Sequence, residues 1–111
     1  MTCKVRWTRP ALVDLNDAHA YLQERNRVAA RRFAAEVRAA IARLRQHPRI
    51  GPRLEAAPIP GEIRSLVLGN HRVVYRLEAE VLTVLRFWDC QRDPDALWSR
   101  VARTGEDPSD G

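Results

Sequence analysis

The residues best able to do chemistry are arginines in one stretch of the sequence, Gly61 to Pro94. This stretch reads as three short strands with arginines among their apolar residues, and it ends in an Arg-Asp-Pro turn. Because side chains alternate along a strand, we expect one sheet face to pack on helices and the other to present arginines around an apolar patch. The arginines assigned to that second face are Arg64, Arg72, Arg76 and Arg86.

The clustering of these arginines across neighbouring strands predicts an anion-binding surface. The alternative is a solvated outer face on which arginine keeps the sheet soluble. Alternation along the third strand is taken as unbroken, which places Arg86 on the same face as Val84 and Trp88. Tyr75 of the second strand is predicted to point inward and to be structural.

Arginines alone can support RNA cleavage, because guanidinium groups stabilise the charge of the phosphorane-like transition state. That scheme normally also needs a general base and acid, and this face offers no lysine, histidine or tyrosine clearly placed for them. His19, His47 and His71 lack the i, i+4 partner of a helical metal pair, so we expect no metal and no cofactor. Asp14 and Asp17 are interpreted as solvated carboxylates.

Two further candidates follow the third strand. Arg92 stands before Asp93-Pro94, where it serves either as the ion-pair partner of Asp93 in a turn or in a functional role. Trp98 either anchors a last helix to the core or lies exposed as a stacking platform.

The charge of the chain favours an anionic partner. The net charge is +5 and Lys4 is the only lysine. Between Arg25 and Arg53 there are nine arginines and one acid, Glu36, a pattern that suits either nucleic acid or an acidic protein. Cys3 and Cys90 have no metal-ligand spacing, so reduced thiols are expected, with a disulfide as the alternative. Without a signal-peptide core or a membrane-length apolar run, we expect a cytoplasmic protein.

A helical hairpin is predicted ahead of the sheet. A short strand over 5–7 leads to a first helix over 9–25, with Thr8 as its N-cap, and Asn26 breaks it from a second helix over 28–46. The face of the second helix opposite its apolar stripe carries arginines spaced by seven, Arg31, Arg38 and Arg45.

The segment after the helical hairpin predicts a sheet, and the two parts together predict an α+β domain over residues 1–103. A proline-rich loop over 49–60 precedes three strands, and turns as short as Gly69-Asn70 make these strands an antiparallel meander. The predicted strands cover 62–68, 71–78 and 81–88. A short helix is expected over 94–103, and the polar tail over 104–111 is expected to be disordered.

The order of these elements, together with particular residues, resembles the RelE/ParE superfamily, the toxins of bacterial type II toxin–antitoxin modules. The likeness spans about Val5 to Pro94. It rests on the helical hairpin with Leu15, Tyr21 and Phe33, the strand start Gly61-Glu62-Ile63-Arg64, Arg72-Val73-Val74-Tyr75-Arg76, and the Leu85-to-Asp93 strand ending in Gln91-Arg92-Asp93.

Two branches of this superfamily imply different activities. A RelE-like toxin is a ribosome-dependent mRNA endonuclease, and by position its basic set would be Arg64, Arg72 and Arg92. The catalytic tyrosine position of that branch would fall at Trp98, which cannot act as acid or base. The lysines that RelE-like toxins carry on the sheet are also absent from this chain.

The strand motifs look closer to the ParE-like branch, whose members poison DNA gyrase and have no known hydrolytic site. A histidine common there near the end of the last strand is Asp89 in this chain. We therefore predict a ParE-like toxin, suited to plasmid stabilisation, with a RelE-like endonuclease and a degenerate toxin that only binds its antitoxin as alternatives. The predicted target-binding residues are Arg64, Arg72, Arg76, Arg86, Arg92 and Trp98.

The resemblance also implies a cognate antitoxin and a hetero-oligomeric complex. An acidic, partly disordered antitoxin segment is expected to fold onto the helical hairpin and to cover an apolar groove beside its leucines. The predicted antitoxin-binding residues are Leu15, His19, Leu22, Arg31, Arg38 and Arg45.

Overall fold

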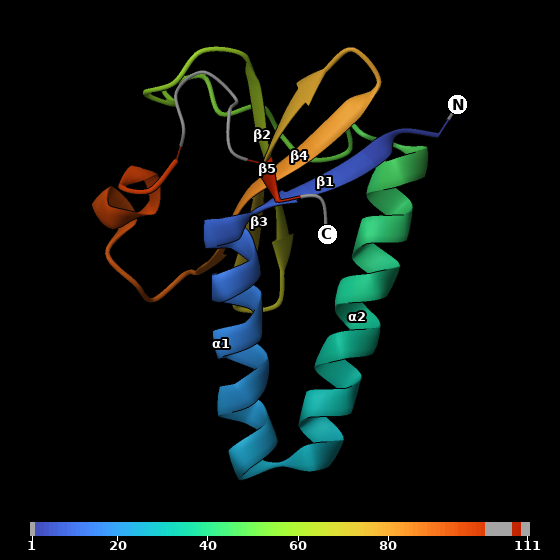
Figure 1. The fold of residues 1–111 in the computed structure, drawn as a ribbon, viewed down its shortest axis with the longest axis vertical. Helices are drawn as coiled ribbons and strands as arrows, with labels where there is room; N and C mark the ends of the chain where they lie inside the picture. Colours follow the sequence, from blue (N-terminus) through green and yellow to red (C-terminus); the bar gives the residue numbers. More distant parts are fainter. Residues whose placement is uncertain (1, 102–107, 110–111) are drawn as a thin grey trace.

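The computed structural model describes residues 2–101 and 108–109 of the chain. Its elements are β1 (Lys4–Thr8), α1 (Arg9–Arg25), α2 (Arg27–Gln46), β2 (Glu62–Leu68), β3 (His71–Glu78), β4 (Val81–Asp89), the 3-10 helix η1 (Pro94–Trp98) and β5 (Pro108–Ser109). Two helices and a mixed sheet make this an α+β fold, as predicted (Figure 1).

The helical hairpin forms where the capping residues predict it. The side chain of Thr8 accepts the N–H of Ala11 at 3.2 Å, which satisfies a donor that the first turn of α1 leaves free. Asn26 ends α1 and begins α2: its N–H donates to the carbonyl of Leu22, and its side chain accepts the N–H of Ala29. A single residue separates the two helices, which run antiparallel (Figure 1). Neither described helix is long and apolar enough to cross a membrane.

The sheet has the strand order β2-β3-β4-β1-β5. The antiparallel meander of β2, β3 and β4 is confirmed, and β1 joins it in parallel alongside β4. The short β5 pairs antiparallel with β1, and it is the described part of the predicted tail; the rest of the tail lies outside the described residues. At the last residue of β1, the hydroxyl of Thr8 donates to the carbonyl of Leu85 in β4 at 3.0 Å, so the start of α1 is fastened to the sheet.

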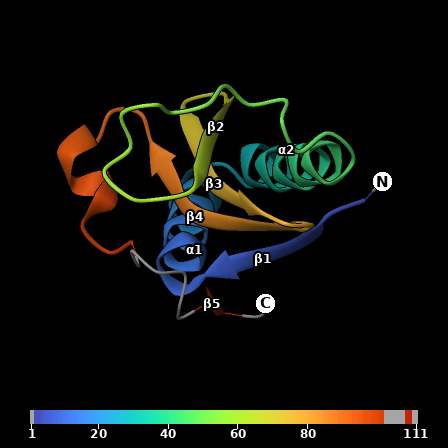
Figure 2. The ribbon, with the colours of Figure 1, turned by 90° about the horizontal axis from the view of Figure 1, so that it is seen from above.

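Apolar side chains gather on both faces of this sheet. The helix-side cluster joins the helices to one face, and its buried members include Phe33, Leu44, Val73, Tyr75 and Phe87. The loop-side cluster covers the other face, and its buried members are Ile59, Ile63, Val74, Leu85, Trp88 and Leu97. Seen from above, the loop between α2 and β2 passes over β2, and η1 lies beyond β4 on the side away from α2 (Figure 2).

A bulge in β4 changes which side chains share a face. Val74 of β3 is opposite Arg86, whereas the next residue, Tyr75, is opposite Val84, so Leu85 is an extra residue in β4. The prediction of unbroken alternation is therefore wrong for this strand. Val84 lies in the helix-side cluster, while Leu85 and Trp88 lie in the loop-side cluster.

The predicted last helix is only a 3-10 helix of five residues, η1. Asp93 caps it by accepting the N–H of Asp95 at 3.0 Å. Leu97 is its one buried residue, and a single buried side chain gives little stabilisation to a longer helix in water.

Candidate functional site

The sheet arginines lie on two different faces. Arg64 is opposite Tyr75 in the β2–β3 pairing, so its side chain starts on the face that packs against the helices. Arg76 is opposite Ile63, which belongs to the loop-side cluster on the other face. The prediction that all four arginines share one face is therefore wrong. Alternation shows which residues of one strand share a face, but only the register between strands shows which faces of two strands coincide.

The loop-side face is also largely covered. Arg76 is only 8% exposed and Arg86 only 4%. Ile59 of the α2–β2 loop and Leu97 of η1 are buried against this face, and Trp98 is half-buried beside them. The arginines predicted to present an open basic surface are thus mostly enclosed, and Trp98 packs on the loop-side cluster.

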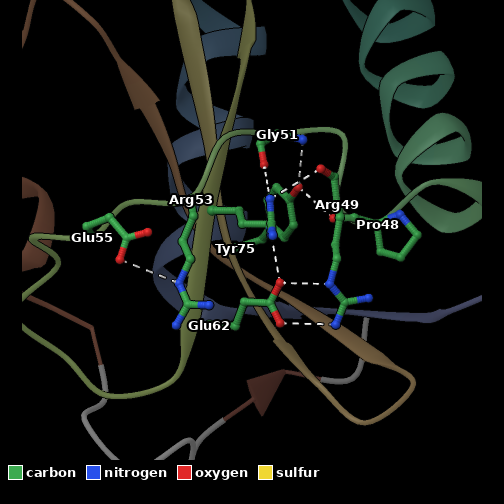
Figure 3. Close-up of polar contacts among 8 residues, drawn as sticks. Pro48, Arg49, Gly51, Arg53, Glu55, Glu62 and Tyr75 are labelled. Atoms are coloured by element: carbon green, nitrogen blue, oxygen red, sulfur yellow. Dashed lines mark hydrogen bonds and ion pairs between the residues drawn. The ribbon is translucent and has the colours of Figure 1, made fainter.

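Arg64 holds the loop that follows α2 by bonding to Glu62 and Gly51, both labelled in Figure 3. Its Nε donates to the Glu62 carboxylate at 2.7 Å and its Nη1 donates to the carbonyl of Gly51 at 2.8 Å. Arg49 donates to the same carboxylate with two nitrogens, at 3.0 and 3.1 Å. The Arg64 side chain therefore has a structural partner on each side, and only 16% of it is exposed.

Tyr75 points inward, as predicted, and fixes the same loop from below. Its hydroxyl donates to the carbonyl of Pro48 at 2.7 Å and accepts the N–H of Gly51 at 3.2 Å. Burial raises the pKa of the Tyr75 hydroxyl. Gly51 is needed at this point, because a Cβ there would lie 2.6 Å from the carbonyl oxygen of Ser65.

The carboxylate of Glu62 makes the network sensitive to acid. Hydrogen bonds from Arg64, and then from Arg49, hold the pKa of Glu62 below its ordinary value of 4.5, although burial opposes them. A carboxyl whose pKa is lowered in the folded state stabilises that state above its unfolded pKa, and this contribution disappears as the pH falls through the folded pKa.

We expect Glu62→Gln to lower the free energy of unfolding at pH 7 and to lose this effect as the pH falls below 4.5, because the wild-type carboxyl then becomes protonated too. Urea unfolding of both proteins between pH 7 and pH 3 measures the difference. Glu80→Gln removes a carboxylate from an exposed turn and is the control. A difference between Glu62→Gln and wild type that stays constant over this range would contradict the role of the carboxylate.

Asp14 and Arg86 form a buried ion pair, so the interpretation of Asp14 as a solvated carboxylate is wrong. Arg86 donates to Asp14 with Nε at 2.7 Å and Nη2 at 2.8 Å, and each side chain is about 5% exposed. The backbone N–H of Phe87 also donates to Asp14, at 3.2 Å. Among the described residues, β1 pairs only with the first half of β4, so Asp14 satisfies a backbone donor at an edge that no described strand covers.

Arg92 is the most exposed of the predicted target-binding arginines, and Arg72 lies on the loop-side face near it, since both adjoin Trp88. Arg72 is half-buried and lies opposite Val67 on β2, which is 63% exposed, and opposite Trp88 on β4. The guanidinium carbon of Arg92 lies 4.1 Å from the centre of the Trp88 ring, and its Nη1 lies 3.6 Å from Asp14. A cation over the face of an indole is favourably placed, and the Arg92 side chain is still 54% exposed.

A groove of about 660 Å³ opens between the helical hairpin and the β2–β3 turn. The rings of Phe33, His71 and Phe87 meet beneath it, with centroids 4.9 to 5.7 Å apart. Burial lowers the pKa of His71, against the opposing charge of Asp89. The groove also takes acidic side chains from α1 and α2, Asp14, Asp17 and Glu36, together with Arg32 and Arg92. Among the described residues, no group of three His, Cys, Asp or Glu side chains is placed to hold a metal ion.

The family of the chain follows from a sequence comparison. A family model described as the ParE toxin of the type II toxin–antitoxin system, parDE, matches residues 5–94, from β1 to the first residue of η1. The chain belongs to the ParE toxin family. This family match confirms the predicted membership of the RelE/ParE superfamily. A comparison with curated proteins finds no match.

Solved structures show the ParE-type fold as well. A structure described as the chromosomal ParDE TA system from P. aeruginosa is 19% identical, with a TM-score of 0.65, and the match covers 81% of this chain and 98% of that one. The toxin–antitoxin complex RelBE2 from Mycobacterium tuberculosis is 25% identical, with a TM-score of 0.58, and the match covers 80% of this chain and 99% of that one.

In this ParE family member, the predicted antitoxin-binding residues lie on two sides of the hairpin. Leu22 lines the groove, whereas Leu15 packs against the helix-side cluster and His19 is half-buried. The exposed arginines of α2 lie on the flank of the helix away from the groove, because each directly follows a buried core position; these are Arg31, Arg38 and Arg45.

Sequence reasoning missed the residues of the other flank of α2, which line the groove: Ala29, Arg32 and Glu36. Their shared position on one side of α2 could have been predicted from their spacing in the sequence. They recur at intervals of three and four on the side of the apolar stripe opposite the seven-residue arginine repeat.

Proposed function

We propose that this ParE family member is a cytoplasmic toxin that binds and inhibits DNA gyrase, and that a cognate antitoxin neutralises it. The family match over residues 5–94 supports the toxin assignment. One observation about the site favours an inhibitor over a nuclease: the arginines that a RelE-like nuclease would use are not gathered on one surface.

That RelE-like set consists of Arg64, Arg72 and Arg92. Arg64 starts on the helix-side face and is engaged by Glu62 and by loop carbonyls. Arg72 lies on the opposite face of the sheet, beside Val67. Phosphoryl chemistry needs its cationic groups to converge on one reacting centre, so this arrangement is better suited to binding a target than to cleaving one.

The proposed target-binding surface is the accessible part of the loop-side face. It comprises Arg72 and Arg92, with Val67 as an exposed apolar neighbour and Trp88 beneath them. Arg86 is left out of this surface because Asp14 and the carbonyl of Leu97 already occupy its guanidinium. Arg72 and Arg92 both adjoin the indole of Trp88, and arginine is enriched at the centre of protein interfaces.

The likeness to the RelBE2 complex keeps a ribosome-dependent endonuclease as the second candidate. The two activities differ in which process fails first. A nuclease would stop protein synthesis, whereas a gyrase inhibitor would stop replication and raise the DNA damage response.

An antitoxin partner is supported by the two solved structures, which are described as toxin–antitoxin systems. We place its docking site over the groove between the helical hairpin and the β2–β3 turn. This groove is a large concave surface, and Arg92 of the proposed target-binding surface lines it.

Expression of the chain alone in a bacterium, with separate labels for DNA, RNA and protein synthesis, tests the function. We expect DNA synthesis to fall first and the purified protein to inhibit supercoiling by gyrase. Early collapse of protein synthesis would favour the nuclease, and normal growth would indicate a degenerate toxin.

Arg72→Ala and Arg92→Ala are each expected to reduce growth inhibition at least tenfold, because arginines at the centre of an interface often contribute more than about 2 kcal/mol to binding. Arg43→Ala, an exposed change on α2, is the matched control. Circular dichroism confirms that each variant is folded. Full toxicity of both variants would refute the assignment of this surface.

A further inference from the structure

We infer that the groove binds a segment of the antitoxin that carries a large apolar side chain flanked by arginine or lysine. This inference rests on the proposed function, and it concerns which part of the partner the groove accepts. The sequence predicts an acidic antitoxin segment on the helical hairpin, but the groove itself has a different chemistry.

The floor of the groove suits an apolar side chain. The ring of His71 stacks on Phe87 at 4.9 Å, and Phe33 meets Phe87 edge to face at 5.7 Å. Leu22 and Leu68 line the adjoining wall. Burial lowers the pKa of His71, which favours the neutral imidazole in this floor. Aromatic surfaces of this kind are favourable contacts for aliphatic and aromatic side chains.

The rim of the groove is acidic, although the chain as a whole carries +5. Its carboxylates are those of Asp14, Asp17, Glu36 and Asp89, against the two guanidinium groups of Arg32 and Arg92. Asp14 is already neutralised by Arg86. Within residues 2–101, Asp17 and Glu36 form no ion pair, and both are exposed.

These two carboxylates approach the groove from opposite sides. Asp17 comes from α1 and Glu36 comes from α2, and the apolar floor lies between the helices. An acidic segment placed there would meet like charges, whereas an arginine or lysine beside a buried apolar side chain would find a carboxylate on either wall. Long cationic side chains also cover apolar surface with their methylene groups.

Acidic parts of the same antitoxin have another surface available. The exposed arginines on the far flank of α2, Arg31, Arg38 and Arg45, carry positive charge that is directed away from the groove. The hairpin therefore presents two surfaces of opposite sign to one partner, and the sign of each fixes which segment of the partner can lie on it.

Binding of the purified toxin to the antitoxin encoded beside it, measured at low salt, tests the inference. The double variant Asp17→Asn/Glu36→Gln keeps the shape of both side chains and removes both charges. We expect it to bind the antitoxin about tenfold more weakly than wild type, since two partly exposed charge pairs are lost. The matched control is Glu78→Gln/Glu80→Gln, which makes the same change in net charge at the exposed β3–β4 turn, and we expect it to bind like wild type or slightly more tightly.

The sign of the effect decides the outcome. An unchanged or tighter complex with Asp17→Asn/Glu36→Gln would overturn this inference alone, because an acidic segment gains from the loss of groove carboxylates. Failure of the wild-type toxin to bind the antitoxin at all would overturn the proposed function, and this inference with it.

Discussion

Replacing Asp14 by alanine is expected to lower the free energy of unfolding by about 3–5 kcal/mol, because Arg86 then remains buried without its counter-charge. The backbone N–H of Phe87 also loses its acceptor. Urea denaturation measures the change, which is a large part of the total stability of a typical small domain.

Two further variants separate charge from packing. Asp17→Ala removes an exposed carboxylate one turn further along α1 and is expected to change stability by no more than about 0.5 kcal/mol. The double variant Asp14→Leu/Arg86→Met, which replaces the pair by apolar side chains, is expected to recover much of the loss, since a buried pair is itself expensive to desolvate. Equal losses in Asp14→Ala and Asp17→Ala would show that the ion pair contributes little.

Replacing Phe87 by alanine is expected to cost about 3–5 kcal/mol, the usual range for removing a buried aromatic ring from a core. Phe87 is 1% exposed, and its ring contacts those of both Phe33 and His71. The variant would leave a cavity beneath the groove, and thermal unfolding measures the loss.

Tyr21→Ala is the matched comparison, because Tyr21 also lines the groove but is 58% exposed. Its ring contacts the guanidinium of Arg25 at 3.7 Å, and loss of such an exposed cation–π contact costs only about 0.5–1 kcal/mol. A similar cost for both variants would mean that Phe87 does not anchor the core.

Regular elements were predictable wherever local chemistry decides them. Thr8 and Asn26 cap the helices, so the bounds of α1 agree with the prediction and α2 begins one residue earlier than expected. Gly69-Asn70 sets the β2–β3 turn, and the meander follows from the short connections.

The site was less predictable because it depends on contacts between distant residues. The bulge at Leu85 has no signal within β4 itself, and it shifts the faces of the residues after it. Asp14 has the spacing of a solvent-facing residue, and only the uncovered edge of β4, more than 70 residues away, gives it a buried role. Arg64 appeared to be functional because a guanidinium on a strand gives no indication that a loop will fold over it.

The parallel pairing of β1 with β4 has a consequence for synthesis of the chain. Lys4 is opposite Val81, and Thr8 is bonded to Leu85, a separation of 77 residues. A nascent chain therefore has its helical hairpin available long before β1 has a partner, and contacts of such long range close slowly. Polypeptides released before β4 is made cannot complete the sheet. The folded sheet therefore requires translation at least through β4, because β1 has its parallel partner only there.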